Sequence, residues 1–308
     1  MHIPSIKNVL LVMFLLLCMM LPLVSQGTRE SEITQITETA AIDAMGRTVS
    51  VTGPIQRVMV VGRAAVMPAD ALFLFPAASE MEIRLATTDQ GLGDFFSLIR
   101  PDLDEGGRLG QQISAEEIIS YRPDLVLTKT RNYDTVATLV EPFGIPVFVM
   151  DLETPQAWKD EIVQLGTLLG DEDTPKRVIE AFERREADVD ARIAQVEASE
   201  RPSILIMQVA ASDGVTSFSV APKNWIQSSI AIRAGADPVW QQSTVDAQAW
   251  KKVSFEQIAA WNADHILLIS YREPVDGFIE QIKSSRQWQN LAALRSDQLH
   301  ASPSDVMN

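Results

Sequence analysis

The stretch that decides the fold runs Ser114-Ala115-Glu116-Glu117-Ile118-Ile119-Ser120-Tyr121-Arg122-Pro123-Asp124-Leu125-Val126-Leu127. A serine followed three residues later by glutamate is the capping-box signature of a helix start. The aliphatic run that closes the stretch is too short for a helix but suits a buried parallel strand. The stretch therefore predicts a capped helix, a Pro-Asp turn and a buried strand.

The same pattern returns in the second half of the chain, in Ser254-Phe255-Glu256-Gln257-Ile258-Ala259-Ala260-Trp261-Asn262-Ala263-Asp264-His265-Ile266-Leu267-Leu268. Two similar α/β units so far apart predict two similar lobes. A cleft between two lobes is a common place for a small molecule to bind.

The length of 308 residues is ample for two lobes and an export signal. Residues 1–27 have the composition of a secretory signal, with Lys7 before an apolar run and Ser25 and Gly27 before the expected cleavage point. The alternative is a retained membrane anchor.

Cys18 is the only cysteine, so cleavage would leave no thiol for disulfides, metal ligation or nucleophilic catalysis. Residues 28–42 are expected to form a flexible leader.

The chain is strongly acidic, with a formal net charge of −15 that becomes −16 when Lys7, the only charged residue of the signal, is removed. Such a surface repels phosphate backbones, so nucleic acid is not an expected partner. An anionic ligand stays possible where a cleft carries local arginine and lysine.

The order of strands and helices predicts an α/β fold with two Rossmann-like lobes, each with a central, mainly parallel sheet. The N-terminal lobe is expected at 43–157 and the C-terminal lobe at 201–308, with a first strand at 203–209. Between them, 158–200 predicts a helical connector without strands. Its long helix, expected at 175–199 after a Thr174 cap, would be about 37 Å long. That helix is either a strut joining the lobes or a bundle helix in one of them.

Polar and aromatic residues follow the predicted strands. The carboxyl ends of parallel strands share one edge of a sheet, where such sheets bind ligands. Basic groups there can meet carboxylates or phosphates, and aromatic rings can face a flat ligand. The alternatives are ordinary loop solvation and, for Trp225 and Trp250, a place in the core. The candidate ligand-binding residues are Arg63, Lys129, Arg131, Asn132, Tyr133, Asp213, Trp225, Tyr271 and Arg272.

No motif predicts catalysis or a resident cofactor. The run Gly91-Leu92-Gly93-Asp94-Phe95-Phe96 has phenylalanine where a dinucleotide fingerprint needs its third glycine. Nucleophile-elbow, zincin and Walker-type runs are absent from the sequence. His265 and His300 are isolated in the sequence, and without cysteine they do not predict a zinc site. The expectation is a binding protein, with no catalytic or metal-ligating residues.

Several sequence blocks occur in a fixed order along residues 43–303. They are Asp43-x-x-Gly46-Arg47 with Pro54 and Arg57-Val58, Ile113-Ser114-x-Glu116-x-Ile118 with Pro123-Asp124-Leu125-Val126, Gly144-Ile145-Pro146-Val147, Val253-Ser254-x-Glu256-Gln257, Asn262-Ala263-Asp264, and Trp288-x-x-Leu291. Taken together, these blocks and their order resemble the substrate-binding proteins of ATP-binding-cassette (ABC) importers, in the rigid-helix class that carries ferric siderophores, haem and cobalamin. The resemblance implies two Rossmann-like lobes joined by one long helix, with modest hinge motion.

The resemblance also implies docking on a permease through one glutamate on each lobe. The first matches Glu116. The second would fall on Ala231, which is not acidic, so that Asp237 or Asp246 could serve instead. The chain also ends before the family's usual last long helix, which would make the second lobe a truncated one.

The expected function is that of an exported, monomeric binding protein that captures a metal chelate between its lobes and delivers it to an ABC permease and its ATPase. A ferric siderophore is the first candidate ligand. Cobalamin, haem or an oxyanion such as molybdate or tungstate are the alternatives. A tethered sensor or adaptor with the same fold is the alternative to delivery.

Overall fold

The computed structural model describes residues 38–87, 95–103, 106–110 and 112–302. The predicted signal at 1–27 and most of the predicted leader lie outside this part. Strand β1 (Glu38–Ile42) pairs antiparallel with β2 (Thr48–Thr52). Ala41 is buried, and the Ile42 N–H donates to Oε1 of Gln164 at 2.8 Å. The expectation that the leader extends to residue 42 was therefore wrong, because its last five residues are a paired strand of the fold.

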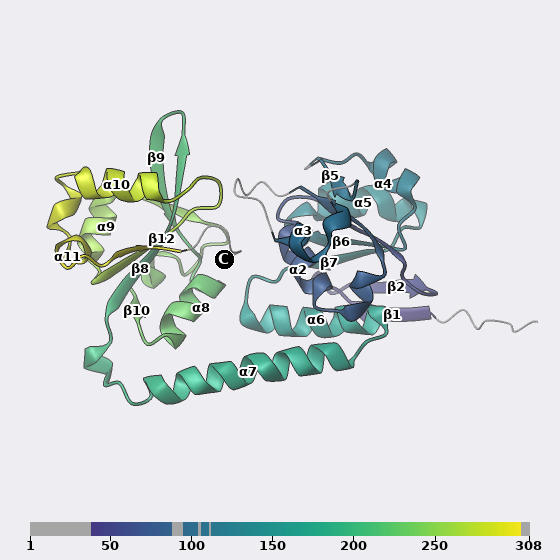
Figure 1. The fold of residues 1–308 in the computed structure, drawn as a ribbon, viewed down its shortest axis with the longest axis horizontal. Coiled ribbons are helices and arrows are strands. Elements are labelled where there is room, and N and C mark those ends of the chain that lie inside the picture. Colours follow the sequence, from purple (N-terminus) through teal and green to yellow (C-terminus); the bar gives the residue numbers. More distant parts are fainter. Residues whose placement is uncertain (1–37, 88–94, 104–105, 111, 303–308) are drawn as a thin grey trace, which may run out of the picture. The chain divides into compact units, whose positions relative to one another are not determined.

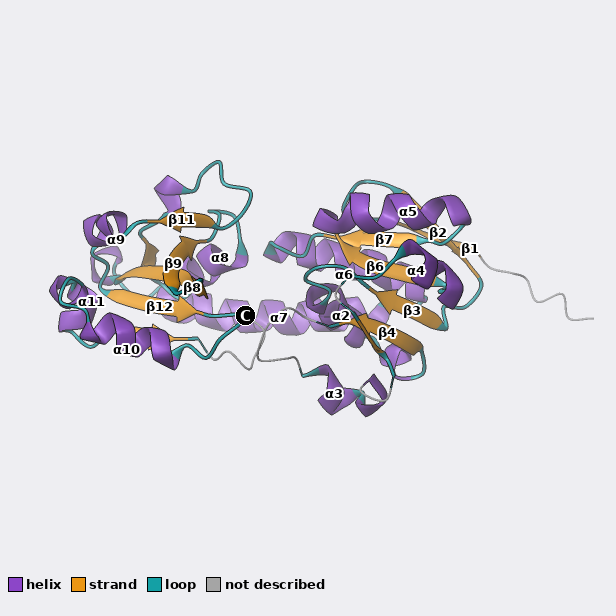
Figure 2. Ribbon diagram, turned by 90° about the horizontal axis from the view of Figure 1, so that it is seen from above, coloured by secondary structure: helices purple, strands orange, loops and turns teal. Residues whose placement is uncertain are grey.

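The first lobe contains a parallel sheet in the order β5-β4-β3-β6-β7. Figure 2 shows β4, β3, β6 and β7 side by side in this order. Alternate residues of β3, β6 and β7 face two separate core clusters, with Val60 and Leu127 in one and Met59 and Val126 in the other. Both faces of the sheet are therefore buried, as a parallel sheet requires. The strands are β3 (Arg57–Val60), β4 (Glu82–Ala86), β5 (Arg108–Leu109), β6 (Leu125–Lys129) and β7 (Val147–Met150).

Three helices of this lobe are α2 (Val66–Phe73), α3 (Phe96–Ile99) and α4 (Ala115–Tyr121). The segment that follows the 3₁₀ turn after β6 is helical in three short pieces. A π-helical turn (Tyr133–Ala137) leads into α5 (Thr138–Val140), and a 3₁₀ turn (Glu141–Phe143) follows. Further 3₁₀ turns cover Pro76–Ser79, Pro101–Leu103 and Thr130–Asn132.

The second lobe has its own sheet in the order β11-β9-β8-β12-β13, with β10 paired to β8. The pairs β8–β12, β12–β13 and β10–β8 are parallel, whereas β9 pairs antiparallel with both β8 and β11. Parallel pairing thus dominates, with an antiparallel hairpin at one edge. The strands are β8 (Ser203–Ser212), β9 (Val215–Val220), β10 (Asp237–Pro238), β11 (Lys251–Val253), β12 (His265–Ile269) and β13 (Leu299–Ala301).

The first strand of this lobe is longer than expected, because β8 continues past Val209 into a hairpin. Asp213 and Gly214 form its two-residue loop, with φ of +52° and +77°. This is the backbone of a type I′ turn, which Asp-Gly favours. The helices of the lobe are α8 (Ile226–Arg233), α9 (Phe255–Trp261), α10 (Asp276–Ser284) and α11 (Ala292–Arg295), with 3₁₀ turns at Gln241–Ser243 and Trp288–Asn290.

Two helices lead from the first lobe to the second: α6 (Pro155–Leu169) and α7 (Asp173–Ile193), as Figure 1 shows. At about 1.5 Å per residue, α7 is about 32 Å long. It ends six residues before the expected end, and a 3₁₀ turn occupies Ala198–Glu200. Thr174 is not its cap but its second residue, whose N–H donates to Oδ1 of Asp171 at 2.9 Å.

The repeated unit has the same local structure in both lobes. Ser114 and Ser254 each accept a hydrogen bond from the N–H three residues on, and each helix ends at a residue with positive φ, Arg122 or Asn262. An aspartate then reaches the start of the neighbouring strand. In the first lobe the Asp124 carboxylate accepts from the Arg57 N–H at 2.8 Å, and in the second Asp264 accepts from the Ser203 N–H at 2.9 Å. Over the part of the chain that the structure describes, no helix combines the length and hydropathy that a membrane crossing requires.

Candidate functional site

Asn132 organises the edge of the first sheet where β3 and β6 end. Its Nδ2 donates to the carbonyl of Arg63 at 3.0 Å and to Thr128 Oγ1 at 3.1 Å, and its Oδ1 accepts from the Arg63 N–H at 3.2 Å. A Cβ at Gly62 would lie 2.6 Å from this amide, so the close approach requires glycine. The buried side chain of Asn132 therefore holds the backbone of Arg63, and Arg63 itself is exposed.

Lys129, at the end of β6, is 2% exposed. Its ammonium bonds to the carbonyl of Asp151 and pairs with Glu153 at 2.8 Å. From the other side, the buried carboxylate of Glu161 accepts from the Asp151 N–H at 2.8 Å and from the Leu152 N–H at 3.5 Å. These contacts hold Leu152 at φ +58°, an uncommon value for leucine. Burial raises the pKa of Glu161 to about 7.

Tyr133 and Arg131 follow Lys129 in the sequence, but their surroundings differ from those of Lys129. The Arg47 guanidinium lies 4.8 Å from the centre of the Tyr133 ring, and Arg47 itself pairs with Asp43 and Glu141. Tyr133 also packs against a core cluster of the first lobe, so its contacts are those of a packing residue. Arg131 is exposed.

The second lobe presents a row of three aromatic side chains, Trp225, Trp250 and Tyr271. The Trp225 and Trp250 ring centres lie 6.0 Å apart, and those of Trp250 and Tyr271 lie 6.3 Å apart, both with edge-on geometry. All three residues are half-buried. Neither tryptophan is therefore fully enclosed in the core, and part of each remains able to contact a ligand.

A cavity of about 270 Å³ adjoins this row, lined by residues of the β8–β9 hairpin and by the residues that follow β12. Tyr271, Lys252 and Arg272 line it together with the hydroxyl residues Ser217, Ser219 and Ser270. Lys252 and Arg272 are exposed cations, and Ser270 is buried. Glu273 lines it as well, so the cavity combines two cations and one carboxylate with hydroxyl groups and one aromatic wall.

Gln227, on the first turn of α8, is a buried neighbour of Tyr271. Burial raises the pKa of Tyr271 to about 12, a hydrogen bond from the Gln227 side chain opposes the rise, and the charge of Glu153 adds to it. Tyr271 therefore stays protonated at physiological pH. Oε1 of Gln227 has no hydrogen-bond partner within the described ranges, so it can accept one from a ligand or a water.

The structure thus brings together some of the predicted residues and separates others. Arg63 lies with Asn132, Lys129 is enclosed by its own ion pair, and Trp225 lies with Tyr271 and Arg272 around Trp250 and the cavity. Asp213 lies at the exposed tip of the β8–β9 hairpin, away from the strand ends where it was expected.

Sequence reasoning missed Lys252, Gln227, Glu153 and Glu161. Lys252 lies on β11, which was not predicted because three residues with two lysines carry no strand signal. Glu153 and Glu161 are brought to Lys129 by the turn into α6, so they had no signal of their own. In the part of the chain that the structure describes, His, Cys, Asp and Glu side chains do not form a group of three or more that could hold a metal ion.

Comparisons with known proteins agree on one family. A family model described as periplasmic binding protein matches residues 110–306, which is more than half of the chain. No curated protein sequence matches.

Solved structures with a similar fold include the molybdate-binding protein MolA of Haemophilus influenzae, solved with molybdate (19% identity, 86% of this chain and 83% of that chain covered, TM-score 0.66). A periplasmic binding protein from Veillonella parvula is similar too (16% identity, 86% and 90% covered, TM-score 0.65). So is the triscatecholate siderophore binding protein FeuA of Bacillus subtilis, solved with ferri-bacillibactin (16% identity, 86% and 92% covered, TM-score 0.62). The chain belongs to the periplasmic binding protein family.

Proposed function

We propose that this protein is exported, captures a metal chelate at the carboxyl ends of its strands, and delivers it to an ABC permease and its ATPase. A ferric siderophore is the ligand we propose first. The observation that carries this proposal is the row of Trp225, Trp250 and Tyr271 beside a cavity lined by Lys252 and Arg272.

The chemistry of this site suits a flat, anionic group. Half-buried aromatic rings contribute apolar contact area to a planar ligand, and each well-packed ring contact is worth about 0.5–1.5 kcal/mol beyond burial. Cations at the rim attract carboxylates or catecholates and fix their orientation. Lys129 contributes differently, because its ammonium already pairs with Glu153; we propose that it fixes the loop after β7 rather than contacting the ligand.

An oxyanion such as molybdate or tungstate is the second candidate. The serine hydroxyls and Lys252 in the cavity of about 270 Å³ favour it, because a small tetrahedral anion needs several donors at short range. Such a ligand would make no use of the tryptophan row. Haem and cobalamin, in contrast, would use the row through their flat rings.

The test is a thermal-shift and tryptophan-fluorescence panel of a ferric tris-catecholate, a ferric hydroxamate, haem, cobalamin and molybdate. A ligand at 100 times its dissociation constant should add about 2.7 kcal/mol to the free energy of unfolding. We expect Trp250→Ala to weaken binding of the ferric chelate about 10-fold. No stabilisation by any of the five would contradict the binding role, and molybdate binding that ignores Trp250→Ala would select the second candidate.

The two lysines of β11 provide a matched control. Lys252 lines the cavity, whereas the ammonium of Lys251 donates to the carbonyl of Ser243 at 2.6 Å. We expect Lys252→Ala to weaken an anionic chelate about 10-fold, while Lys251→Ala leaves the affinity unchanged. Equal effects of both substitutions would indicate a general charge effect instead of a site.

We further propose that the permease is met by Glu116 of the first lobe and Glu256 of the second. Both are exposed and occupy the second position of a serine-capped helix, α4 or α9, in the repeated unit. Ala231, the position first suggested for the second acid, is buried in α8 and 2% exposed. Glu256 is therefore the better partner of Glu116 than Asp237 or Asp246. A matched pair of acids favours delivery over a sensor or adaptor role.

A further inference from the structure

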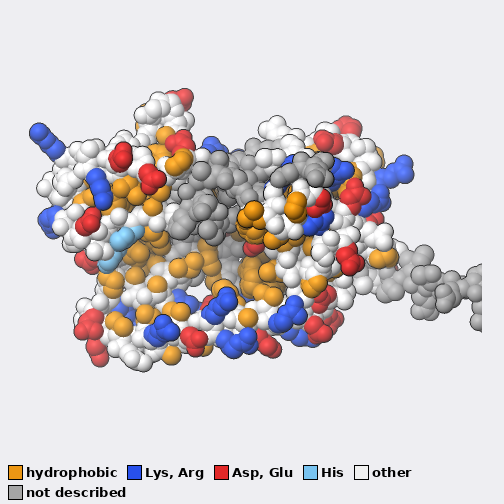
Figure 3. Space-filling model, viewed as in Figure 1, with side chains coloured by type: hydrophobic (Ala, Val, Ile, Leu, Met, Phe, Trp, Pro, Cys, Tyr) orange, Lys and Arg blue, Asp and Glu red, His pale blue; other side chains and the backbone are white. Residues whose placement is uncertain are grey.

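The connecting helix α7 carries charged side chains of both signs along its surface (Figure 3). One of them, Glu186, differs from the rest in its partners. Its Oε1 lies 2.6 Å from Nη1 of Arg233 on α8, and its Oε2 lies 3.4 Å from Nζ of Lys159 on α6. One carboxylate therefore contacts a helix before the connector and a helix of the second lobe.

Glu186 is well enclosed for a charged residue. Its side chain is 16% exposed and that of Lys159 is 18% exposed, whereas the carboxylate of Glu180 on the same helix is 70% exposed. Ion pairs sheltered in this way are screened less by salt than exposed ones. They also lose more when one partner is removed, because the remaining charge stays partly desolvated.

The packing on the α6 side holds Lys159 in place. Its ammonium also pairs with Glu183 at 3.0 Å and lies 5.9 Å from the centre of the Phe182 ring. Phe182 in turn packs on Trp158, with ring centres 5.5 Å apart. The hydrogen bonds that the Lys159 ammonium donates to Glu183 and Glu186 raise the pKa of Lys159, so the ammonium keeps its charge.

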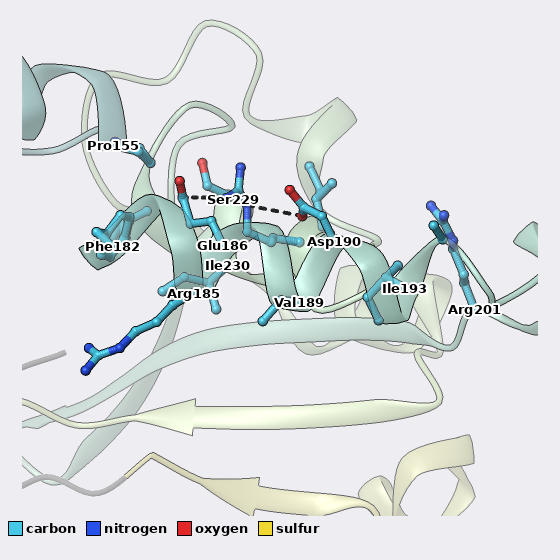
Figure 4. A pocket seen from close by; sticks show the side chains of 14 residues that line it. Pro155, Phe182, Arg185, Glu186, Val189, Asp190, Ile193, Arg201, Ser229 and Ile230 are labelled. Carbon is cyan, nitrogen blue, oxygen red and sulfur yellow. Dashed lines mark ion pairs between the residues drawn. The ribbon is translucent and has the colours of Figure 1, made fainter. Parts of the chain in front are cut away.

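The packing on the α8 side is more open, since the Arg233 side chain is 39% exposed. Arg233 pairs with Asp190 at 3.7 Å as well as with Glu186. A Cβ at Gly235, just after α8, would lie 2.8 Å from Ile193 at the end of α7. Between these contacts, α7 and α8 enclose a groove of about 750 Å³ in which Glu186 and Asp190 take part (Figure 4). The two helices thus touch at an ion-pair cluster and at a glycine contact, with open space beside them.

We infer that Glu186 is a positioning residue that ties α6 and α8 to the same connecting helix and so fixes the angle between the two lobes. The reason is topological. With Lys159 on one side and Arg233 on the other, a change of the lobe angle at α7 must lengthen at least one of the two ion pairs. The binding residues of the two lobes are then held in a fixed relative position before a ligand binds. This reduces the free-energy cost of ordering them on binding.

The test measures the lobe angle without any ligand. Spin labels at Ser120→Cys on α4 and Ser296→Cys after α11, both exposed, report the distance between lobes in the full chain with Cys18→Ser. We expect a narrow distance distribution that becomes about twice as broad with Glu186→Gln, as a second lobe orientation gains population. Lys159→Met should broaden it in the same way. An unchanged distribution in both variants would overturn the inference.

Glu180→Gln is the matched control. Its carboxylate lies on the same helix and pairs only at 4.0 Å with Arg184 of that helix, among the ion pairs of the described residues. This substitution removes the same charge without touching α6 or α8, so it should leave the distribution unchanged. Broadening by Glu180→Gln would show that helix charge, and not the shared contact, is responsible.

The inference rests on the proposed function only for its effect on affinity. If the ligand-competent orientation becomes a minor fraction, the apparent dissociation constant rises in inverse proportion to that fraction, so Glu186→Gln should weaken a ferric tris-catecholate about 3-fold to 10-fold. If no chelate binds the unmodified protein, the proposed ligand is wrong while the distance measurement still decides the role of Glu186. Far-UV circular dichroism on each variant confirms that it is folded.

Discussion

The two copies of the capped helix and strand are nearly identical locally, yet the sheets that contain them differ. In the first lobe, β6 lies between two parallel strands of an entirely parallel sheet. In the second, β12 lies between the parallel strands β8 and β13, but β8 then continues into an antiparallel hairpin. The comparison teaches that the unit is encoded by its own residues, while its surroundings depend on segments far away in the chain.

The largest expected effect tests whether the two units contribute equally to stability. Ile118 in α4 and Ile258 in α9 occupy the same position of the repeat, and each is 1% exposed. Ile118→Ala and Ile258→Ala should each lower the free energy of unfolding by about 2–5 kcal/mol, because each leaves a cavity under its helix. Urea unfolding followed by tryptophan fluorescence measures both. A loss confined to one variant would show that one unit is dispensable.

The two lobes also hold their strand-end loops by different chemistry. After β7, the buried side chains of Glu161 and Lys129 hold Asp151 and Leu152. After β12, the buried hydroxyl of Ser270 donates to the carbonyl of Glu273 at 2.6 Å. One loop therefore depends on a titrating group, and the other depends on a neutral one.

This difference predicts a pH dependence that belongs to the first lobe. The pKa of Glu161 rises from 4.5 to about 7 on folding, because burial disfavours its charge. The folded protein then binds the proton more tightly, so stability is fully present below pH 4.5 and falls as pH rises to about 7. Between pH 4.5 and about 7, this effect should lower the free energy of unfolding of the unmodified protein by about 2 kcal/mol. We expect Glu161→Gln to abolish this decrease. Urea titrations at several pH values measure it. Ser270→Ala is the control, and an unchanged slope in Glu161→Gln would contradict the assignment.

A smaller effect sharpens the comparison at the helix starts. Ser254 has the full capping box, since Oε1 of Gln257 also accepts from the Ser254 N–H at 3.2 Å, whereas Ser114 accepts from the Glu117 N–H at 3.2 Å. Ser114→Ala and Ser254→Ala should each cost about 1 kcal/mol. Gln257→Ala should cost a few tenths of a kcal/mol more than Glu117→Ala. Equal costs in thermal unfolding would mean that the reciprocal bond adds nothing.

What the sequence predicted well depends on short-range signals. The serine caps, the Pro-Asp turn and the short aliphatic strands are each determined by neighbouring residues, and the predicted parallel sheets follow from their order. The hairpin also had a local signal, the Asp213-Gly214 pair, which favours a type I′ turn; that signal was overlooked. Strand β11 had none, because Lys251 and Lys252 form a strand only where β9 is available to pair.

The candidate site was harder to predict because its residues meet only through the fold. Tyr133 follows a strand, as a ligand contact would, but an arginine from the β1–β2 turn covers its ring. Lys129 has the right position, but Glu153, 24 residues later, neutralises it. Lys252 reaches the site from β11, a strand with no sequence signal, and Trp250 is the residue just before that strand. Position after a strand thus predicted the edge of the sheet correctly and the individual contacts only in part.

The smallest effect on stability belongs to the pair of exposed acids, and it tests the repeat at the level of function. Glu116 and Glu256 project from equivalent first turns, so removing either charge should change the free energy of unfolding by less than about 0.5 kcal/mol. Neither residue lines the cavity, and ligand affinity should stay unchanged. Uptake of the bound chelate by cells that carry the cognate permease should fall about 10-fold in Glu116→Gln and in Glu256→Gln alike, as expected for loss of a charged interface contact worth about 1.4 kcal/mol. Glu117→Gln, one residue further along α4, is the control. If Glu116→Gln impairs uptake and Glu256→Gln does not, the permease distinguishes the two lobes. The two units would then share a local structure but not a role in docking.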